Sequence, residues 1–131
     1  MIKGIGVDIV EIDRVRRALD RYEKLATRLF TAREQEYCSR KICSHRHFAL
    51  RFAAKEAVLK SMGIGLRGVK WTDIEISHDR LGKPLVSLKG KAAEQAEKSG
   101  IDDILISLSI SRDNAVASAV AMGGQGDRGI A

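Results

Sequence analysis

The run KGIGVDIV, residues 3–10, is followed by EIDRVRRALDRYEKLATRLF, residues 11–30, and the spacing of the apolar side chains changes between the two. In the first run the apolar residues alternate with other residues, at Ile5, Val7 and Ile9. This alternation predicts a short strand over residues 3–10. Gly4 and Gly6 leave room on that strand for a close approach by another backbone.

In the second run, apolar residues recur at every third or fourth position. That spacing predicts an amphipathic helix over Glu11–Phe30 with one face turned to the core. The basic residues fall together on roughly the opposite side, at Arg14, Arg17, Arg21, Lys24 and Arg28. The predicted helix therefore presents a basic stripe to solvent.

Two more helices are predicted in the first half of the chain. Thr31 and Glu34 have the T-x-x-E spacing of a capping box, so a helix should begin there and run to about Arg40. After a polar loop, His47–Met62 should form a third helix that stops at Gly63. A row of small side chains along it, at Ala49, Ala53 and Ala57, would let another element pack closely.

The second half of the chain predicts two hairpins separated by a helix. The expected strands are 72–77 and 85–89, then 104–110 and 115–122, with the helix over 91–99. The fold class is therefore α+β, with a mainly antiparallel sheet packed against a long N-terminal helix and a buried central helix. We expect one domain over residues 1–122 and a mobile, glycine-rich tail over 123–131.

Composition limits the function classes. The chain has 131 residues, 44% of them hydrophobic, which suits a single core. It has neither an apolar run of about 20 residues nor a signal-like N-terminus, so we expect a cytoplasmic protein that does not enter a membrane. The net charge of +6 favours an acidic partner, but 5% aromatic residues offer few stacking platforms for nucleic acid. Cys38 and Cys43 are too few for a disulfide framework and are expected to be free thiols.

Two carboxylates occupy unusual places in this pattern. Asp8 lies where the first strand gives way to a helix, and Glu56 lies at the border of the apolar face of the third helix. Each has an ordinary structural explanation: Asp8 as a helix cap, and Glu56 as the partner of Lys60 one turn later. The functional alternative is a pair of oxygen ligands for Mg²⁺, which often takes only one or two protein carboxylates and completes its shell with phosphates and water. Arg51, Lys55 and Lys60 would then neutralise the remaining phosphate charge.

Several motifs together resemble a known family. GIGVDIVEIDR, FT-x-x-E, RFAAKEAVLKSMGIG, the GKP of Gly82–Pro84, and SLS followed by an NAVA strand are similar to the holo-[acyl-carrier-protein] synthases, the small trimeric class of 4′-phosphopantetheinyl transferases. The likeness extends from about Met1 to Met122, in the same order and with similar spacing.

The resemblance implies a reaction. The hydroxyl of a serine on apo acyl carrier protein would attack the β-phosphate of coenzyme A, taking the phosphopantetheine group and releasing adenosine 3′,5′-bisphosphate, for fatty-acid biosynthesis. Asp8 and Glu56 at the matching positions would ligate Mg²⁺, and Lys60 would lie beside the phosphates. Two acceptors for the serine proton stay open, a water molecule on the metal and Glu56 itself.

The resemblance also assigns binding residues. Arg51 and Lys55 would help to bind coenzyme A, and Gly82, Lys83 and Pro84 belong to the segment that contacts the nucleotide. Gly63 has two readings, a helix terminator and part of a phosphate cradle. The stripe containing Arg14, Arg17 and Arg21 would meet the acidic recognition helix of the carrier protein, although a solvated helix face is the ordinary reading of such a stripe.

One position departs from the pattern, because Ser109 is followed by Ile110 where many relatives have a histidine. The role of that histidine is therefore not transferred to this chain. The family also implies a homotrimer with active sites between subunits. Two other readings remain: a basic module that binds nucleic acid through the first helix, and a catalytically silent relative that binds coenzyme A without transfer.

Overall fold

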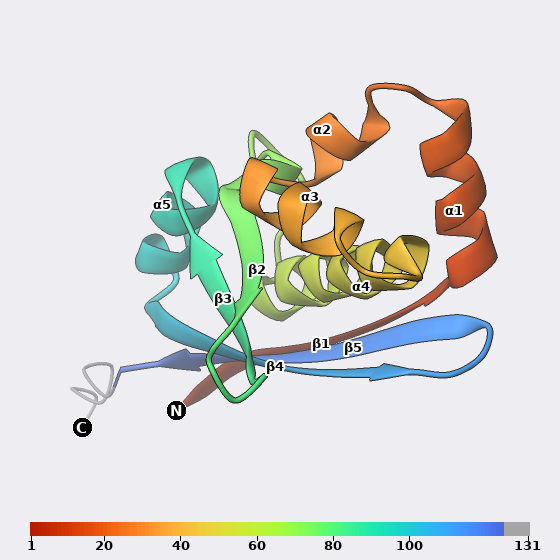
Figure 1. Ribbon diagram of the computed structural model, residues 1–131. Coiled ribbons are helices and arrows are strands. Elements are labelled where there is room, and N and C mark those ends of the chain that lie inside the picture. The colour runs from red at the N-terminus through yellow and green to blue at the C-terminus, as the bar shows by residue number, and fades with distance from the viewer. Residues whose placement is uncertain (125–131) are drawn as a thin grey trace.

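The computed structural model describes residues 1–124, which form two antiparallel sheets and a set of helices around one central helix. Strands β1 (Ile2–Glu11), β5 (Asn114–Gly123) and β4 (Ile101–Ile110) make a three-stranded sheet in the order β1-β5-β4. Figure 1 shows α4 (Ser44–Met62) lying across one face of this sheet. The α+β class and the buried central helix are confirmed.

The remaining elements surround this layer. They are α1 (Ile12–Arg21), α2 (Leu25–Leu29), α3 (Ala32–Ser39), the short 3₁₀ turn η1 (Trp71–Asp73), the hairpin of β2 (Ile74–His78) and β3 (Pro84–Leu88), and α5 (Gly90–Lys98). The two predicted hairpins are present, but they belong to different sheets because β1 pairs with β5 and leaves β2 and β3 as a separate pair. β2 begins at Ile74 and not at Thr72, since residues 71–73 form the 3₁₀ turn.

The contact between α4 and the sheet is made by small residues on both sides. The β5 residues that face α4 are fully buried alanines, at Ala115, Ala117, Ala119 and Ala121. On β1, a Cβ atom at Gly6 would lie 2.1 Å from the carbonyl oxygen of Ala57, and one at Gly4 would lie 2.0 Å from that of Ser61. The predicted close approach at these two glycines is therefore a direct contact between the backbones of β1 and α4.

The opposite face of the three-stranded sheet is uncovered in the single chain. It carries exposed apolar side chains from β1 and β4, at Ile5 (68% exposed), Val7 (59%), Ile9 (62%) and Leu105 (46%). We call these four residues the open sheet face. One face of β1 thus packs against α4, and the other face is exposed and can pack against another chain.

The predicted N-terminal helix is interrupted. α1 ends at Arg21, Tyr22 is extended (φ −109°, ψ 103°), and α2 begins at Leu25. The break turns the chain so that Leu29 and Phe30 are buried against Cys38 and Phe48. Burial of this apolar cluster outweighs the few helical hydrogen bonds that the break removes.

Other boundaries differ by a few residues. The capping box at Thr31 and Glu34 is confirmed, with the Thr31 hydroxyl accepting from the Glu34 amide and the Glu34 carboxylate accepting from the Thr31 amide. α4 starts at Ser44, three residues before the predicted start. Gly123 is the last residue of β5, so the strand enters the predicted tail, and residues 125–131 of that tail lie outside the described residues.

No helix within residues 1–124 has the length and apolar character needed to cross a membrane. Cys38 and Cys43 are free thiols, as predicted.

Candidate active site

The alternation of side chains along β1 turns Asp8 towards α4. Asp8 lies on the same face as Gly4 and Gly6, while Ile5, Val7 and Ile9 lie on the open sheet face. On α4, Glu56 comes one residue before Ala57, whose carbonyl meets Gly6. The backbone contact between β1 and α4 therefore brings the two carboxylates together.

Lys60 completes this group. Its ammonium lies 2.9 Å from Asp8 Oδ1 and donates to the carbonyl oxygen of Val7 at 3.1 Å. The other Asp8 oxygen, Oδ2, is buried and has no hydrogen-bond partner within the described part of the chain. A buried carboxylate oxygen without a partner is costly, so it indicates a site made for an additional ligand.

Glu56 is perturbed by the same arrangement. Burial, followed by the neighbouring Asp8 carboxylate, raises the pKa of Glu56 to about 7, and Lys60 opposes the shift. In the absence of a cation, Glu56 therefore keeps its proton in part of the molecules near neutral pH. A divalent cation would replace that proton.

The structure disfavours the two ordinary explanations. The N-cap position of α1 is Glu11, three residues beyond Asp8, so Asp8 does not cap that helix. Within the described residues, the ion-pair partner of Lys60 is Asp8 and not Glu56. This ion pair joins α4 to β1.

The donor set fits a magnesium ion. Residues 1–124 contain no cluster of three or more Asp, Glu, His or Cys side chains that could hold a metal. At this site, Asp8 and Glu56 are the carboxylates that could hold one, next to the buried Asp8 oxygen that has no partner. Mg²⁺ is commonly bound by one or two carboxylates together with substrate phosphates and water. The two-carboxylate site therefore matches an ion that binds with a phosphorylated substrate.

The carboxylates lie at the edge of a groove of about 600 Å³ between α1, α2 and α4. Its lining is mainly apolar, with Val15, Leu19, Leu25, Leu29, Phe52 and Trp71, and Arg14 and Arg28 also contribute. The groove can thus hold an apolar segment beside the acidic pair.

A second hollow, of about 330 Å³, gathers other predicted residues. Arg51, Gly82 and Pro84 line it together with Tyr37, His47 and His78, and with residues 106–108 of β4. We call it the Arg51 pocket. The guanidinium of Arg51 lies over the Tyr37 ring, 4.1 Å from its centre, and the rings of Tyr37 and His78 meet edge to face.

Arg51 has no carboxylate partner among the described residues, although only 2% of it is exposed. One of its terminal nitrogens lies 3.1 Å from His78 Nδ1, and its Nε is buried without a partner. An almost completely buried guanidinium with a free donor indicates an anion-binding pocket.

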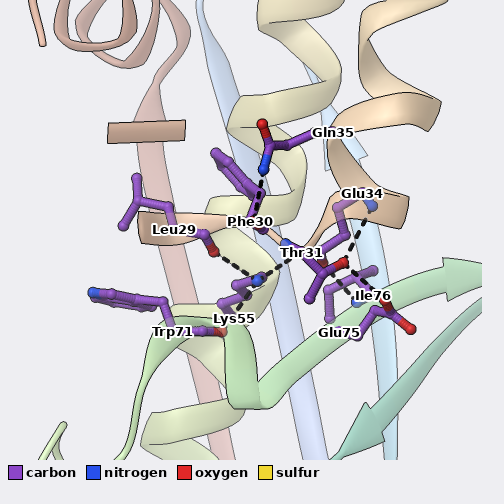
Figure 2. Close-up of polar contacts among 9 residues, drawn as sticks. All are labelled: Leu29, Phe30, Thr31, Glu34, Gln35, Lys55, Trp71, Glu75 and Ile76. Carbon is purple, nitrogen blue, oxygen red and sulfur yellow. Dashed lines mark hydrogen bonds and ion pairs between the residues drawn. The ribbon is translucent and has the colours of Figure 1, made fainter. Parts of the chain in front are cut away.

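Lys55 is placed elsewhere, inside the protein. Figure 2 shows its side chain between Glu34, Leu29 and Trp71. Its ammonium lies 2.6 Å from Glu34 Oε1 and donates to the carbonyl oxygens of Leu29 (2.7 Å) and Trp71 (3.1 Å). Both partners of the ion pair are fully buried, and burial lowers the pKa of Lys55. This position favours a structural role for Lys55 over the predicted contact with coenzyme A.

The same network explains the FT-x-x-E motif. Glu34 accepts from the amide of Thr31 and from that of Ile76, each at 2.8 Å, while the Thr31 hydroxyl donates to Glu75 at 2.7 Å (Figure 2). Glu34 and Lys55 therefore join α3, α4 and β2 at one buried point.

Two other predicted residues lie at turns. Gly63 ends α4 in the left-handed conformation (φ 71°), and it lines neither of the two hollows, which favours its reading as a helix terminator. The Lys83 amide donates to Asp79 Oδ1, and Lys83 is exposed between the two lining residues Gly82 and Pro84.

The three predicted docking arginines are all exposed on α1. Arg14 lines the groove beside the carboxylates, Arg17 forms an ion pair with Asp13, and Arg21 lies over the ring of Tyr22. Lys24 and Arg28 do not continue α1, because the helix ends before them. The basic stripe is thus shorter than the sequence predicts.

The sequence analysis missed Tyr37, His47 and His78. They lie on α3, α4 and β2 with no shared spacing, so only the tertiary structure brings them together. The one available signal is that His47 precedes Arg51 by one helical turn, which places both on one side of α4.

The comparisons with known proteins identify the family. The family model of the 4′-phosphopantetheinyl transferase superfamily matches residues 4–120, and the chain belongs to this superfamily of enzymes. A holo-[acyl-carrier-protein] synthase of Geotalea daltonii is 53% identical over 122 residues, covering 92% of this chain and 98% of that protein. Within the superfamily, the resemblance to the holo-[acyl-carrier-protein] synthases is confirmed.

Solved structures show the same fold. The crystal structure of the synthase from Neisseria meningitidis superposes with a TM-score of 0.87 at 36% identity, covering 93% of this chain and 99% of that one. The structure of the Bacillus anthracis synthase in complex with coenzyme A (3′,5′-ADP) superposes with a TM-score of 0.79 at 32% identity, covering 95% of this chain and 99% of that one.

Proposed function

We propose that this enzyme transfers 4′-phosphopantetheine from coenzyme A to a serine hydroxyl of apo acyl carrier protein, with Mg²⁺ as cofactor, and that it serves fatty-acid biosynthesis. The observation that carries the proposal is the pair of Asp8 and Glu56, with an unpartnered buried oxygen on one and a pKa raised to about 7 on the other. The relatives named holo-[acyl-carrier-protein] synthase and the coenzyme A complexes among the similar structures support it.

In this proposal the residues of the chain position the substrate phosphates and supply charge that stabilises them. Asp8 and Glu56 would hold Mg²⁺, which when bound supplies positive charge against the diphosphate and the leaving oxygen. An ammonium has three donors, and Lys60 uses two of them on Asp8 and the Val7 carbonyl, so one donor is left for a phosphate oxygen. Glu56 must lose its proton before it can ligate the cation.

The proposal places the nucleotide end of coenzyme A in the Arg51 pocket. Arg51 supplies a guanidinium without a carboxylate partner, and Gly82 and Pro84 border the pocket at the β2–β3 turn. The apolar groove beside the carboxylates would take the groups that flank the reacting atoms.

The carrier protein would dock along α1. Arg14 is closest to the reaction site because it lines the same groove as Asp8 and Glu56. The exposed Arg17 and Arg21 extend the positive surface away from it. An acidic partner bound there should associate more slowly as salt rises.

The active assembly would be a homotrimer formed through the open sheet face. A row of exposed Ile5, Val7 and Ile9 on one strand is more apolar surface than a single chain usually leaves to solvent. β1 carries Asp8 on its other face, so such an interface would lie directly behind the proposed metal site.

A mass measurement tests the activity. Incubation with apo acyl carrier protein, coenzyme A and Mg²⁺ should add one phosphopantetheine group to the carrier, and a chelator should stop the gain. Asp8→Asn and Glu56→Gln should each lower kcat roughly 100-fold or more, since each removes one of the two ligands. The matched control is Glu23→Gln, an exposed carboxylate outside the site, which should keep full activity. Full activity of both site variants would refute the metal assignment.

A further inference from the structure

The hydrogen bond between Arg51 and His78 fixes the protonation state of the histidine. A guanidinium can only donate, so His78 Nδ1 must be the acceptor at 3.1 Å and must carry no proton. In the structure without ligand, His78 is therefore neutral and holds one donor of Arg51.

The surroundings of His78 are positively charged. Arg51 and His47 face it from α4, Lys41 faces it from the segment after α3, and Asp79 is its one acidic neighbour. Burial first, and then Arg51, His47 and Lys41, lower the pKa of His78, and Asp79 opposes the shift. Asp79 Oδ1 already accepts from the amides of Leu81 and Lys83 in the β2–β3 turn.

His47 extends the same cluster. Burial and the charges of Lys41, Arg51 and Arg46 lower the pKa of His47. The Tyr37 ring lies among these groups, with Lys41 4.6 Å and Arg51 4.1 Å from its centre. Positive charge thus gathers at one aromatic ring, and the described residues provide no carboxylate partner for Arg51.

We propose that His78 is a proton-linked anion-binding residue: it takes up a proton when the 3′-phosphate of coenzyme A enters the Arg51 pocket. This inference rests on the proposed function and deepens it. The diphosphate of coenzyme A is assigned to Asp8, Glu56 and Lys60, so the 3′-phosphate is the anion left for a pocket that shares no lining residue with the carboxylate groove.

The exchange balances as follows. The phosphate accepts hydrogen bonds from the Arg51 donors, including the one released by His78. His78 takes one proton from solvent onto Nδ1, keeps it, and donates a hydrogen bond from this N–H to a phosphate oxygen. A dianion next to the imidazole raises the pKa of His78, which is the reverse of its shift in the empty pocket. At a pH between the free and bound values, proton uptake accompanies binding, and affinity falls as the pH rises.

Isothermal titration calorimetry with coenzyme A measures the proton directly. Titrations at about pH 7.5 in saturating Mg²⁺, which keeps Glu56 deprotonated throughout, use two buffers of different ionisation enthalpy. They give the protons taken up per coenzyme A, and we expect about 0.3 to 1. Working at this pH keeps the free phosphate nearly dianionic, since its second pKa is about 6. His78→Asn keeps a neutral acceptor for Arg51 but cannot titrate there, so its uptake should fall below about 0.1 proton.

Two controls test whether the proton uptake comes from His78 and the 3′-phosphate. His45→Asn changes the one histidine outside the pocket and should leave the uptake unchanged. Coenzyme A without its 3′-phosphate should bind more weakly and take up no proton.

Coenzyme A binding without proton uptake would overturn the inference and leave the proposed function standing. Uptake that persists in His78→Asn, or with the ligand that lacks the 3′-phosphate, would also overturn it. Absence of coenzyme A binding would overturn the proposed function as well.

Discussion

Glu56 has an acid–base behaviour that a helical glutamate does not normally show. Its pKa is raised from 4.5 to about 7 in the folded chain, so between these values the folded state holds a proton that the unfolded state has lost. Stability therefore falls as the pH rises from about 4.5 to 7, because the folded state binds more protons there. We predict a decrease in the urea midpoint between pH 5 and pH 8 in a chelator, in addition to the effects of other groups.

The Glu56→Gln variant separates this effect from the rest of the chain. Glutamine cannot ionise, so the variant should lose most of the decrease and be more stable than the parent above pH 7. A saturating divalent cation should also reduce the decrease in the parent protein, since it binds the deprotonated form. An equal decrease in parent and variant would contradict the raised pKa.

At the scale of single residues, the sequence could predict the site residues that lie within its short motifs. Asp8 and Glu56 stand out in the sequence because a charge at the edge of an apolar pattern needs a partner, and the fold places them together with Lys60. The position of Lys55 could not be predicted in this way. Its helical spacing puts it beside the candidate site, but Glu34 from another helix binds its ammonium in the core.

At the scale of elements, the junction of β1 and α4 depends on glycine. Gly6→Ala would place a Cβ atom 2.1 Å from the Ala57 carbonyl oxygen and 2.7 Å from the Ser61 amide nitrogen, and neither backbone atom can rotate away. We predict a loss of about 1–3 kcal/mol or more in the free energy of unfolding, measured by chemical denaturation. Gly65→Ala is the control, because nothing lies within 4 Å of its Cβ, and it should stay close to the parent value.

The buried Lys55–Glu34 pair joins three elements. Lys55→Met would leave the Glu34 carboxylate buried without its cation, so we predict a loss of about 3–5 kcal/mol of stability. Arg40→Met breaks the exposed pair with Glu36 and should cost less than about 1 kcal/mol. The double variant Glu34→Gln/Lys55→Met should recover part of the loss, because no unpaired charge remains. Similar effects of the two single variants would show that burial of the pair does not matter.

Elements with strong local signals were predicted within a few residues. The capping box, the stop at Gly63 and the turns of both hairpins depend on neighbouring residues, which the sequence displays directly. The break after Arg21 could not be predicted, because its gain comes from burying Leu29 and Phe30 against residues far along the chain. The division into two sheets likewise follows from the pairing of β1 with β5.

At the scale of the whole molecule, the open sheet face should decide assembly. Ile5→Lys puts a charge among apolar side chains that the proposed homotrimer would bury, so we predict a single-chain mass in sedimentation velocity where the parent shows three. Leu81→Lys changes a side chain that is 95% exposed in the β2–β3 turn and should leave the parent mass unchanged. A parent protein that sediments as one chain would refute the proposed trimer.

The glycine junction also has a consequence for how the enzyme tolerates change. Because main chain touches main chain at Gly4 and Gly6, the span between Asp8 and Glu56 is set by peptide geometry and not by the size of nearby side chains. Removal of a methyl group elsewhere in the core, as in Ile104→Val, would lower stability and leave the proposed cation site unchanged. The apolar core side chains of this fold could thus vary in evolution while the span between Asp8 and Glu56 stays the same.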